Sequence, residues 1–176
     1  MLFIAIFYPV ILVELNYQVN QIQPFRGEII PKDMVFGIVI PKIGANAKIV
    51  ANVDPYNNKE YQLALTQGVA HARGTVFPGE TGNIFLFSHS SVNFYEANRY
   101  NAIFYLLDKL EIGDRIELYY RQEKFIYKVT DKKIVGAQEV KYLSEVGRKK
   151  IVTLMTCYPA GTSWKRLLVL GELDTD

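Results

Sequence analysis

Short apolar runs, broken by glycine, proline, asparagine and aspartate, recur along most of this chain and favour a fold built of strands. The 176 residues fit one domain, and 49% of them are hydrophobic, which is enough for a sizeable core. Many short strands with a few short helices predict a mainly β fold, a closed β-barrel with decorated loops. The predicted strands are Val35–Pro41, Ala47–Val53, Asn83–Ser88, the hairpin arms Arg115–Tyr120 and Phe125–Thr130 around Gln122 and Glu123, Ile151–Cys157 and Arg166–Glu172; the predicted helices are Asn58–Leu65, Ala102–Leu110 and Val140–Val146.

The charge of the chain is nearly balanced. The formal net charge is +2, and no long basic run interrupts the sequence. Nucleic-acid binding proteins carry a strong basic patch or stripe, so nucleic acid is not an expected partner.

The N-terminal residues Met1–Val13 are apolar, and no charge precedes Glu14. A full membrane span needs about 20 apolar residues, so this run is short for one. It is interpreted as the outer part of a membrane anchor, with a signal-peptide core and a buried amphipathic element as alternatives. Residues 14–34 then form a polar tether, and residues 35–176 form the folded domain.

The chain has one cysteine, which excludes an internal disulfide. A lone cysteine is commonly a small buried hydrophobe, so Cys157 needs a suitable neighbourhood to count as a nucleophile. In a strand over Lys150–Cys157 side chains alternate between two faces. One face then holds Val152, Leu154 and Thr156, and the other holds Thr153, Met155 and Cys157.

A reactive thiolate needs a group that favours its charge and a proton donor for the leaving amine. Arg166 opens the strand after Cys157, so an antiparallel hairpin would bring its guanidinium close to the thiol. His89 follows an apolar strand and opens a loop, a position both rigid and accessible. His71 has a less suitable position and is interpreted as a structural or surface histidine.

These residues resemble the signature of the sortases, which are cell-surface cysteine transpeptidases. Residues 153–157 read TLMTC and match the family's TLxTC strand end, and YPAGTSWKRLLVLGEL follows with Arg166 in the family's arginine position. The segment GVAHARGTVFPGETGNIFLFSHS is similar to the one that leads to the family's catalytic histidine, which falls on His89. The segment IFYLLDKLEIGDRIEL is also similar, and the resemblance covers roughly Phe36–Leu173.

The resemblance implies an eight-stranded sortase β-barrel in which Cys157, His89 and Arg166 are catalytic. Cys157 would cleave an LPXTG-like sorting signal near the C-terminus of a surface protein through a thioester. The acyl group would pass to an amine on a cell-wall precursor or another surface protein. Met155 and Thr156 would border the peptide groove, with no metal or cofactor required. The catalytic domain would lie outside the cell membrane and attach through the N-terminal segment.

Some features depart from the family pattern. Ser88 precedes the histidine where the family commonly has glycine, and no lid with an Asp-Pro-aromatic motif is found. The chain also lacks an apolar span after Glu172, so the sequence leaves the subclass open. Another cysteine hydrolase or an L,D-transpeptidase would place histidine and glycine near Cys157 in sequence, and neither is immediately there. A catalytically silent, surface-anchored β-barrel binding module is the remaining alternative.

Overall fold

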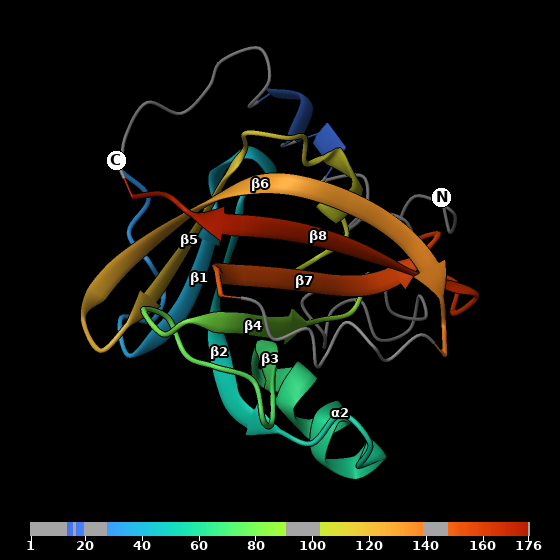
Figure 1. Ribbon diagram of the computed structural model, residues 1–176. Coiled ribbons are helices and arrows are strands. Elements are labelled where there is room, and N and C mark those ends of the chain that lie inside the picture. The colour runs from blue at the N-terminus through green and yellow to red at the C-terminus, as the bar shows by residue number, and fades with distance from the viewer. Residues whose placement is uncertain (1–13, 16, 20–27, 91–102, 139–147, 176) are drawn as a thin grey trace.

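The computed structural model describes residues 14, 15, 17–19, 28–90, 103–138 and 148–175. Its strands close into one barrel in the order β1-β2-β3-β4-β7-β8-β6-β5 (Figure 1), which confirms the predicted mainly β, closed eight-stranded barrel. The strands are β1 (Phe36–Ile40), β2 (Ala45–Val53), β3 (Val69–Ala72), β4 (Gly82–Phe87), β5 (Arg115–Tyr120), β6 (Glu123–Gly136), β7 (Lys150–Tyr158) and β8 (Lys165–Leu173); the helices are η1 (Pro41–Ile43), α2 (Asn58–Gln67) and η2 (Leu107–Lys109).

The interior of the barrel is an apolar cluster to which all of these strands contribute. Alternate residues along each strand point inward, as the two-residue period of a strand requires. On β4 and β7, for example, the inward residues are Ile84, Leu86, Val152 and Leu154, each at most 1% exposed. The remaining residues of these strands face outward, and this division decides which side chains can share a site.

A second apolar cluster covers the outer face of β3, β4 and β8. Helix α2 supplies Ala64 and Leu65 to it, and Phe85 and Phe87 come from β4. Figure 1 shows α2 beside β3 and outside the barrel. Strand β4 is therefore buried on both faces, which explains why its sequence is a continuous apolar run rather than an alternating one.

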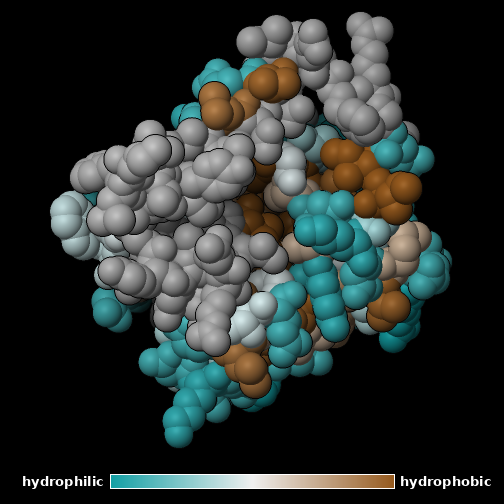
Figure 2. All heavy atoms as spheres, turned by 180° about the vertical axis from the view of Figure 1, so that it is seen from behind, coloured by the Kyte–Doolittle hydropathy of each residue, from teal (hydrophilic) through white to brown (hydrophobic). Residues whose placement is uncertain are grey.

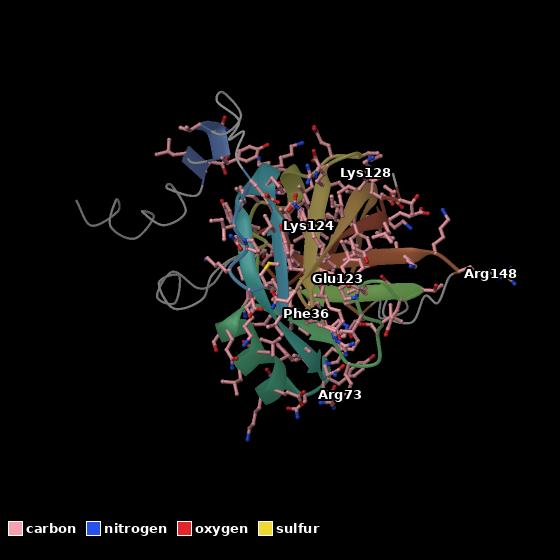
Figure 3. The ribbon with its side chains drawn as sticks, turned by 90° about the vertical axis from the view of Figure 1, so that its left-hand side faces the viewer. Phe36, Arg73, Glu123, Lys124, Lys128 and Arg148 are labelled. Carbon is pink, nitrogen blue, oxygen red and sulfur yellow. The ribbon has the colours of Figure 1, made fainter. Side chains whose placement is uncertain are left out.

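Helix α2 connects the parallel strands β2 and β3 and is held at its first turn by polar contacts. The side chain of Asn57 accepts a hydrogen bond from the backbone N–H of Glu60, which satisfies a donor that the helix itself leaves unpaired. Arg73, just after β3, forms ion pairs with Asp54 at 3.2 Å and with Glu60 at 2.7 Å (Figure 3). These contacts fix α2 against the sheet.

Two strands differ from their predicted extent. Strand β3 was not predicted, because its four residues, VAHA, give a pattern too short to recognise. Strand β6 runs to Gly136 instead of ending at Thr130, because its second half carries polar residues yet pairs with β8 throughout. The predicted hairpin is present, but its turn lies one residue earlier, at Arg121 and Gln122, whose φ angles are 51° and 70°.

The predicted helix over Ala102–Leu110 is wrong for the part that the structure describes. Residues 103–106 form turns, and only the 3-10 helix η2 follows. The apolar residues at helical spacing are buried at one end of the barrel, so their pattern reflects burial rather than an α-helix. The aromatic residues at 104 and 105 also have a lower helix propensity than alanine or leucine. The predicted helix Val140–Val146 lies outside the described residues.

The chain before β1 lies against the barrel surface from residue 28 onward. Asn46 on β2 accepts a hydrogen bond from the backbone N–H of Lys32 and donates one to the carbonyl of Ile30, both at 2.8 Å. Lys124 forms an ion pair with Glu28 at 3.2 Å. No helix in the described ranges is both long and apolar enough to cross a membrane. Seen from behind, the described surface is largely hydrophilic, with hydrophobic residues in separate patches (Figure 2).

Candidate active site

Cys157 lies near the end of β7 and its side chain is on the outward face. The inward residues of this strand are Val152 and Leu154, which belong to the barrel core. The period of two therefore turns Met155 and Cys157 outward and Thr156 inward, as the sequence predicted. Cys157 is a free thiol of intermediate exposure, so it is held by the sheet and still reachable.

Arg166 is the register partner of Cys157 in the antiparallel pair of β7 and β8. Directly opposed residues in such a pair have Cβ atoms about 5 Å apart and side chains on one face. The Arg166 guanidinium donates hydrogen bonds from Nη1 to the carbonyls of Ser163 at 3.1 Å and Lys165 at 3.0 Å. Ser163 belongs to the connection between the strands and Lys165 opens β8, so the start of β8 and the chain just before it hold the guanidinium.

His89 comes two residues after β4, which is the parallel neighbour of β7 on the other side. The pairing continues beyond Phe87, because the Ser88 N–H donates to the Met155 carbonyl at 3.2 Å. The Thr156 hydroxyl adds a hydrogen bond to the Ser88 carbonyl at 2.9 Å. Extended by one further step, this register would place His89 opposite Cys157.

Two of the three predicted catalytic residues, Cys157 and Arg166, are thus paired across β7 and β8, and His89 follows the end of β4, the other neighbour of β7. The inward neighbours Leu86 and Leu167 show which residues of β4 and β8 face the core. The alternation along β8 turns Arg166 outward, on the same face as Cys157, and the same count extended past the end of β4 would turn His89 to that face. Adjacent strands are about 4.8 Å apart, so the three side chains can meet.

The second histidine, His71, lies elsewhere, inside the barrel. It is 0% exposed, and its ring centroid is 4.7 Å from that of Phe77. Its Nδ1 accepts a hydrogen bond from the Asn52 N–H at 3.3 Å, so Nε2 carries the proton and donates to the Val76 carbonyl at 3.1 Å. Burial lowers the pKa of His71 below its ordinary value. These contacts are those of a neutral structural histidine.

The two predicted groove residues occupy different environments. Met155 is partly exposed and packs on the outer cluster that includes Phe87 and Leu168. Thr156 is 3% exposed, and its hydroxyl is engaged with the chain just before His89. The described geometry brings Met155 to the face that carries the thiol and turns Thr156 inward.

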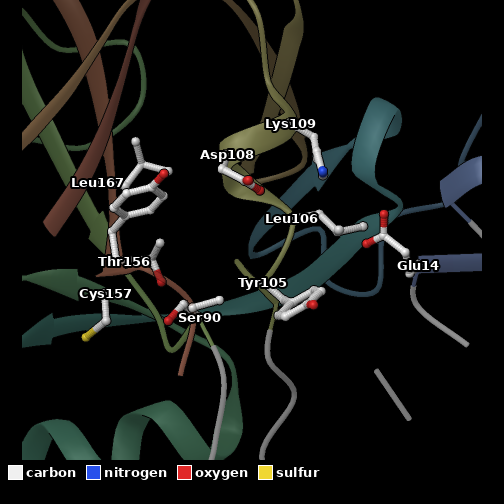
Figure 4. Close-up of a pocket in the computed structure, with 11 residues that line it drawn as sticks. Glu14, Ser90, Tyr105, Leu106, Asp108, Lys109, Thr156, Cys157 and Leu167 are labelled. Atoms are coloured by element: carbon white, nitrogen blue, oxygen red, sulfur yellow. The ribbon is translucent and has the colours of Figure 1, made fainter. Parts of the chain in front are cut away.

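A pocket of about 110 Å³ lies beside Cys157. Figure 4 shows Cys157, Thr156 and Ser90 at one end of it and Lys109 and Glu14 at the other. Pockets for drug-sized ligands have about 300 Å³ or more, so this one suits a side chain or a few waters. A peptide would need the open outward face. The other residues that line the pocket are Tyr105, Leu106, Asp108, Tyr158, Ala160 and Leu167.

Tyr105 and Ser90 in this pocket were not singled out from the sequence. Burial raises the pKa of Tyr105, and the nearby carboxylates of Glu14 and Asp108 raise that pKa further. The only sequence signal was the position of Ser90 directly after His89. Nothing in the local pattern places residue 105 at this end of the barrel. No group of three or more potential metal ligands occurs among the described residues.

Comparisons with known proteins relate most of this chain to one family. The profile of the sortase domain family matches residues 38–174. Sortase D of Bacillus subtilis (strain 168) is 29% identical over 136 residues, which cover 76% of this chain and 60% of that protein. The chain thus spans about 60% of the length of this relative.

Solved sortase structures have a similar fold. Sortase C-1 from Actinomyces oris superposes with a TM-score of 0.69 at 28% identity, over 96% of this chain and 86% of that one. Sortase A from Corynebacterium diphtheriae gives a TM-score of 0.67 at 27% identity, over 92% of this chain and 69% of that one. With a family match over more than half of its length, the chain belongs to the sortase family.

Proposed function

We propose that this protein is a cysteine transpeptidase that cleaves an LPXTG-like sorting signal near the C-terminus of a surface protein. The main support is the pairing of Cys157 with Arg166 across β7 and β8, together with the position of His89 two residues beyond the end of β4, the other neighbour of β7. Acyl transfer by a thiol needs a nucleophile, a proton carrier and a positive group for the oxyanion, and these three residues supply one of each.

In this proposal the Cys157 thiolate attacks the carbonyl carbon of the threonine in the signal. The peptide bond after that threonine breaks, His89 gives its proton to the departing amine, and a thioester remains on Cys157. An incoming amine then loses a proton to His89 and attacks the thioester, which forms a new amide and releases the thiolate. No outside oxidant or reductant is needed.

Arg166 would bind the oxygen that becomes negative during each attack. The hydrogen bonds that hold its guanidinium within the described structure use Nη1. The N–H groups on Nε and Nη2 can therefore turn to a substrate oxygen. Arginine stays charged at all relevant pH values, so this support persists across the reaction.

The peptide would lie along the outward face beside Met155, and Thr156, which is turned inward, would meet it only through the pocket beside Cys157. The proposed acceptor is an amine of a cell-wall precursor or of another surface protein. The apolar segment Met1–Val13 would attach the enzyme to the membrane, with the catalytic domain outside the cytoplasm. That segment carries no charge, which suits contact with lipid.

The test follows the intact mass of the full chain in detergent during incubation with LPXTG-like peptides, with and without an added amine. A thioester adduct is expected on the wild type, none on Cys157→Ala and none on His89→Ala. The matched control is His71→Gln, which should still form the adduct. Product that depends on added amine would identify transfer. Absence of any adduct on folded, reduced protein would favour the binding-module alternative.

A further inference from the structure

The first described part of the chain lies against the pocket beside Cys157. Glu14 lines this pocket, and Tyr17 packs against the barrel core. The Nζ atom of Lys109, from η2, lies 6.0 Å from the centroid of the Tyr17 ring. The first described residues of the chain therefore lie at the end of the barrel where the thiol is.

The outer side of this entry segment is apolar. Leu15 and Val19 are 54% and 57% exposed, and they are four residues apart in a helical segment, so they lie on one side of it. Exposed leucine and valine are unfavourable in water and favourable at the boundary of a bilayer. The uncharged run Met1–Val13 precedes this segment in sequence, separated from Leu15 only by Glu14, and its apolar composition suits contact with lipid.

The connection between β7 and β8 exposes a further amphipathic group. This connection supplies Ala160 to the pocket and leaves Trp164, the sole tryptophan of the chain, 76% exposed. Tryptophan is enriched at the interface between lipid and water, where its ring is buried and its N–H stays wet. Lys165, also exposed, follows directly and suits anionic headgroups.

We infer that this end of the barrel, with Leu15, Val19 and Trp164, rests on the lipid bilayer, so that the pocket and the Cys157 thiol lie at the level of the headgroups. The inference rests on the membrane attachment in the proposed function and adds an orientation to it. Its consequence is that both the sorting signal and the acceptor amine are taken up at the membrane surface. Partners anchored in the same bilayer would then meet the thiol without a long flexible linker.

The experiment uses the lone cysteine as a depth probe. A bimane fluorophore is attached to Cys157 of the full chain, which is then bound to phosphatidylcholine and phosphatidylglycerol vesicles that carry a nitroxide on the lipid headgroup. The control places the fluorophore at Arg148→Cys in a Cys157→Ser background. Figure 3 shows Arg148 at the opposite edge of the molecule from the short helical segment near the N-terminus.

The two probe sites are well separated along β7. A strand rises about 3.3 Å per residue, so Lys150 is already about 23 Å from Cys157, and Arg148 is beyond it. The headgroup layer of one leaflet is only about 7 Å thick. Quenching at Cys157 is therefore expected to be at least about twofold stronger than at Arg148. The emission of Trp164 should also shift to shorter wavelength when the chain binds vesicles.

A paired set of variants separates orientation from attachment. Leu15→Ser with Val19→Ser keeps the segment Met1–Val13, so the chain should still bind, while the ratio of quenching between the two sites falls toward one. Tyr56→Ser with Leu63→Ser removes equally exposed apolar groups near and on α2, which are 75% and 63% exposed, and should leave the ratio unchanged.

Equal or reversed quenching at the two sites, or an unshifted Trp164 spectrum on bound chain, would overturn the orientation. Failure of the chain to bind vesicles would overturn it as well. None of these outcomes touches the adduct assay, which is carried out in detergent. The orientation can thus be contradicted by quenching while the adduct assay still supports the transpeptidase function. The adduct assay can likewise fail while quenching supports the orientation.

Discussion

The two histidines of the chain lie in different surroundings, and these surroundings support the different roles proposed for them. His71 points into the barrel, where its ring is fully buried and hydrogen-bonded as the neutral form. His89 follows the end of β4, directly after Ser88, whose N–H donates to the Met155 carbonyl of β7. A proton carrier must exchange protons with the substrate, which only the outward position allows.

Burial of His71 predicts a specific pH dependence of stability. Its native pKa lies below the value of about 6.5 expected in the unfolded chain. Below pH 6.5 the unfolded state takes up a proton that the native state does not, so the free energy of unfolding falls by up to about 1.4 kcal/mol per pH unit until the native pKa is reached. Above pH 6.5 this contribution is fully present and constant.

Urea unfolding of wild type and His71→Gln between pH 7.5 and pH 5 measures this effect. Glutamine keeps a donor and an acceptor but does not titrate, so the variant should lose less stability on acidification over this range. Parallel pH curves for the two proteins would show that His71 is not the group responsible.

The proposed role of Arg166 depends on the planar shape of its guanidinium as well as on its charge. Arg166→Lys keeps the positive charge but loses the planar fork that is held by the Ser163 and Lys165 carbonyls. The rate of adduct formation should fall by about 10²- to 10³-fold, the usual cost of removing an oxyanion donor. Stopped assays with intact-mass detection follow the rate, and Arg148→Lys, remote and exposed, should match wild type. If Arg166→Lys formed the adduct at the wild-type rate, a positive charge without the planar fork would be sufficient for this step.

The residues of the candidate site come from β7, from β8 and from the chain after β4. How easily each strand could be recognised from the sequence depended on how its faces are buried. The continuous apolar run of β4 was recognisable because the core and α2 bury both of its faces. The alternation in β7 gave its two faces correctly. Strand β3 and the second half of β6 were missed because one is short and the other polar, and only their partners hold them as strands.

The contact between β7 and the end of β4 predicts a role for Thr156. Its hydroxyl donates to the buried carbonyl of Ser88, directly before His89. Thr156→Val removes this bond at constant shape, leaves a carbonyl unpaired and costs about 1–3 kcal/mol of stability. We expect kcat to fall several-fold with KM unchanged, because His89 loses its support.

Steady-state kinetics with Thr156→Ser as the rescue variant distinguish the two roles of this residue. Serine keeps the hydroxyl and should restore kcat. A rise in KM for both variants would instead match the groove role predicted from the sequence.

Considered as a whole, the molecule depends on closure of the barrel, since the interior cluster draws on every strand. A site carried by three strands of a closed sheet is positioned by the whole core and not by local loops alone.

Truncation of a core side chain on β7 tests this dependence. Leu154→Ala, at a 0% exposed position, should lower the free energy of unfolding by about 2–5 kcal/mol through lost burial and a residual cavity. Ile112→Ala, at a 74% exposed position, should change it by less than about 0.5 kcal/mol. Chemical denaturation measures both, and similar values for the two would contradict the described core.

The sequence by itself determined which residues carry reactive groups and which face of its strand each one takes, because side-chain alternation follows from local backbone geometry. It therefore put Met155 and Cys157 on one face and Thr156 on the other. Only the tertiary structure decided that β4 is the other neighbour of β7, that His71 lies inside the barrel, and that Glu14 and Tyr105 line the pocket beside Cys157. Strand partners are chosen by closing long loops around a common core, and that long-range balance of burial and chain entropy leaves no local pattern to recognise.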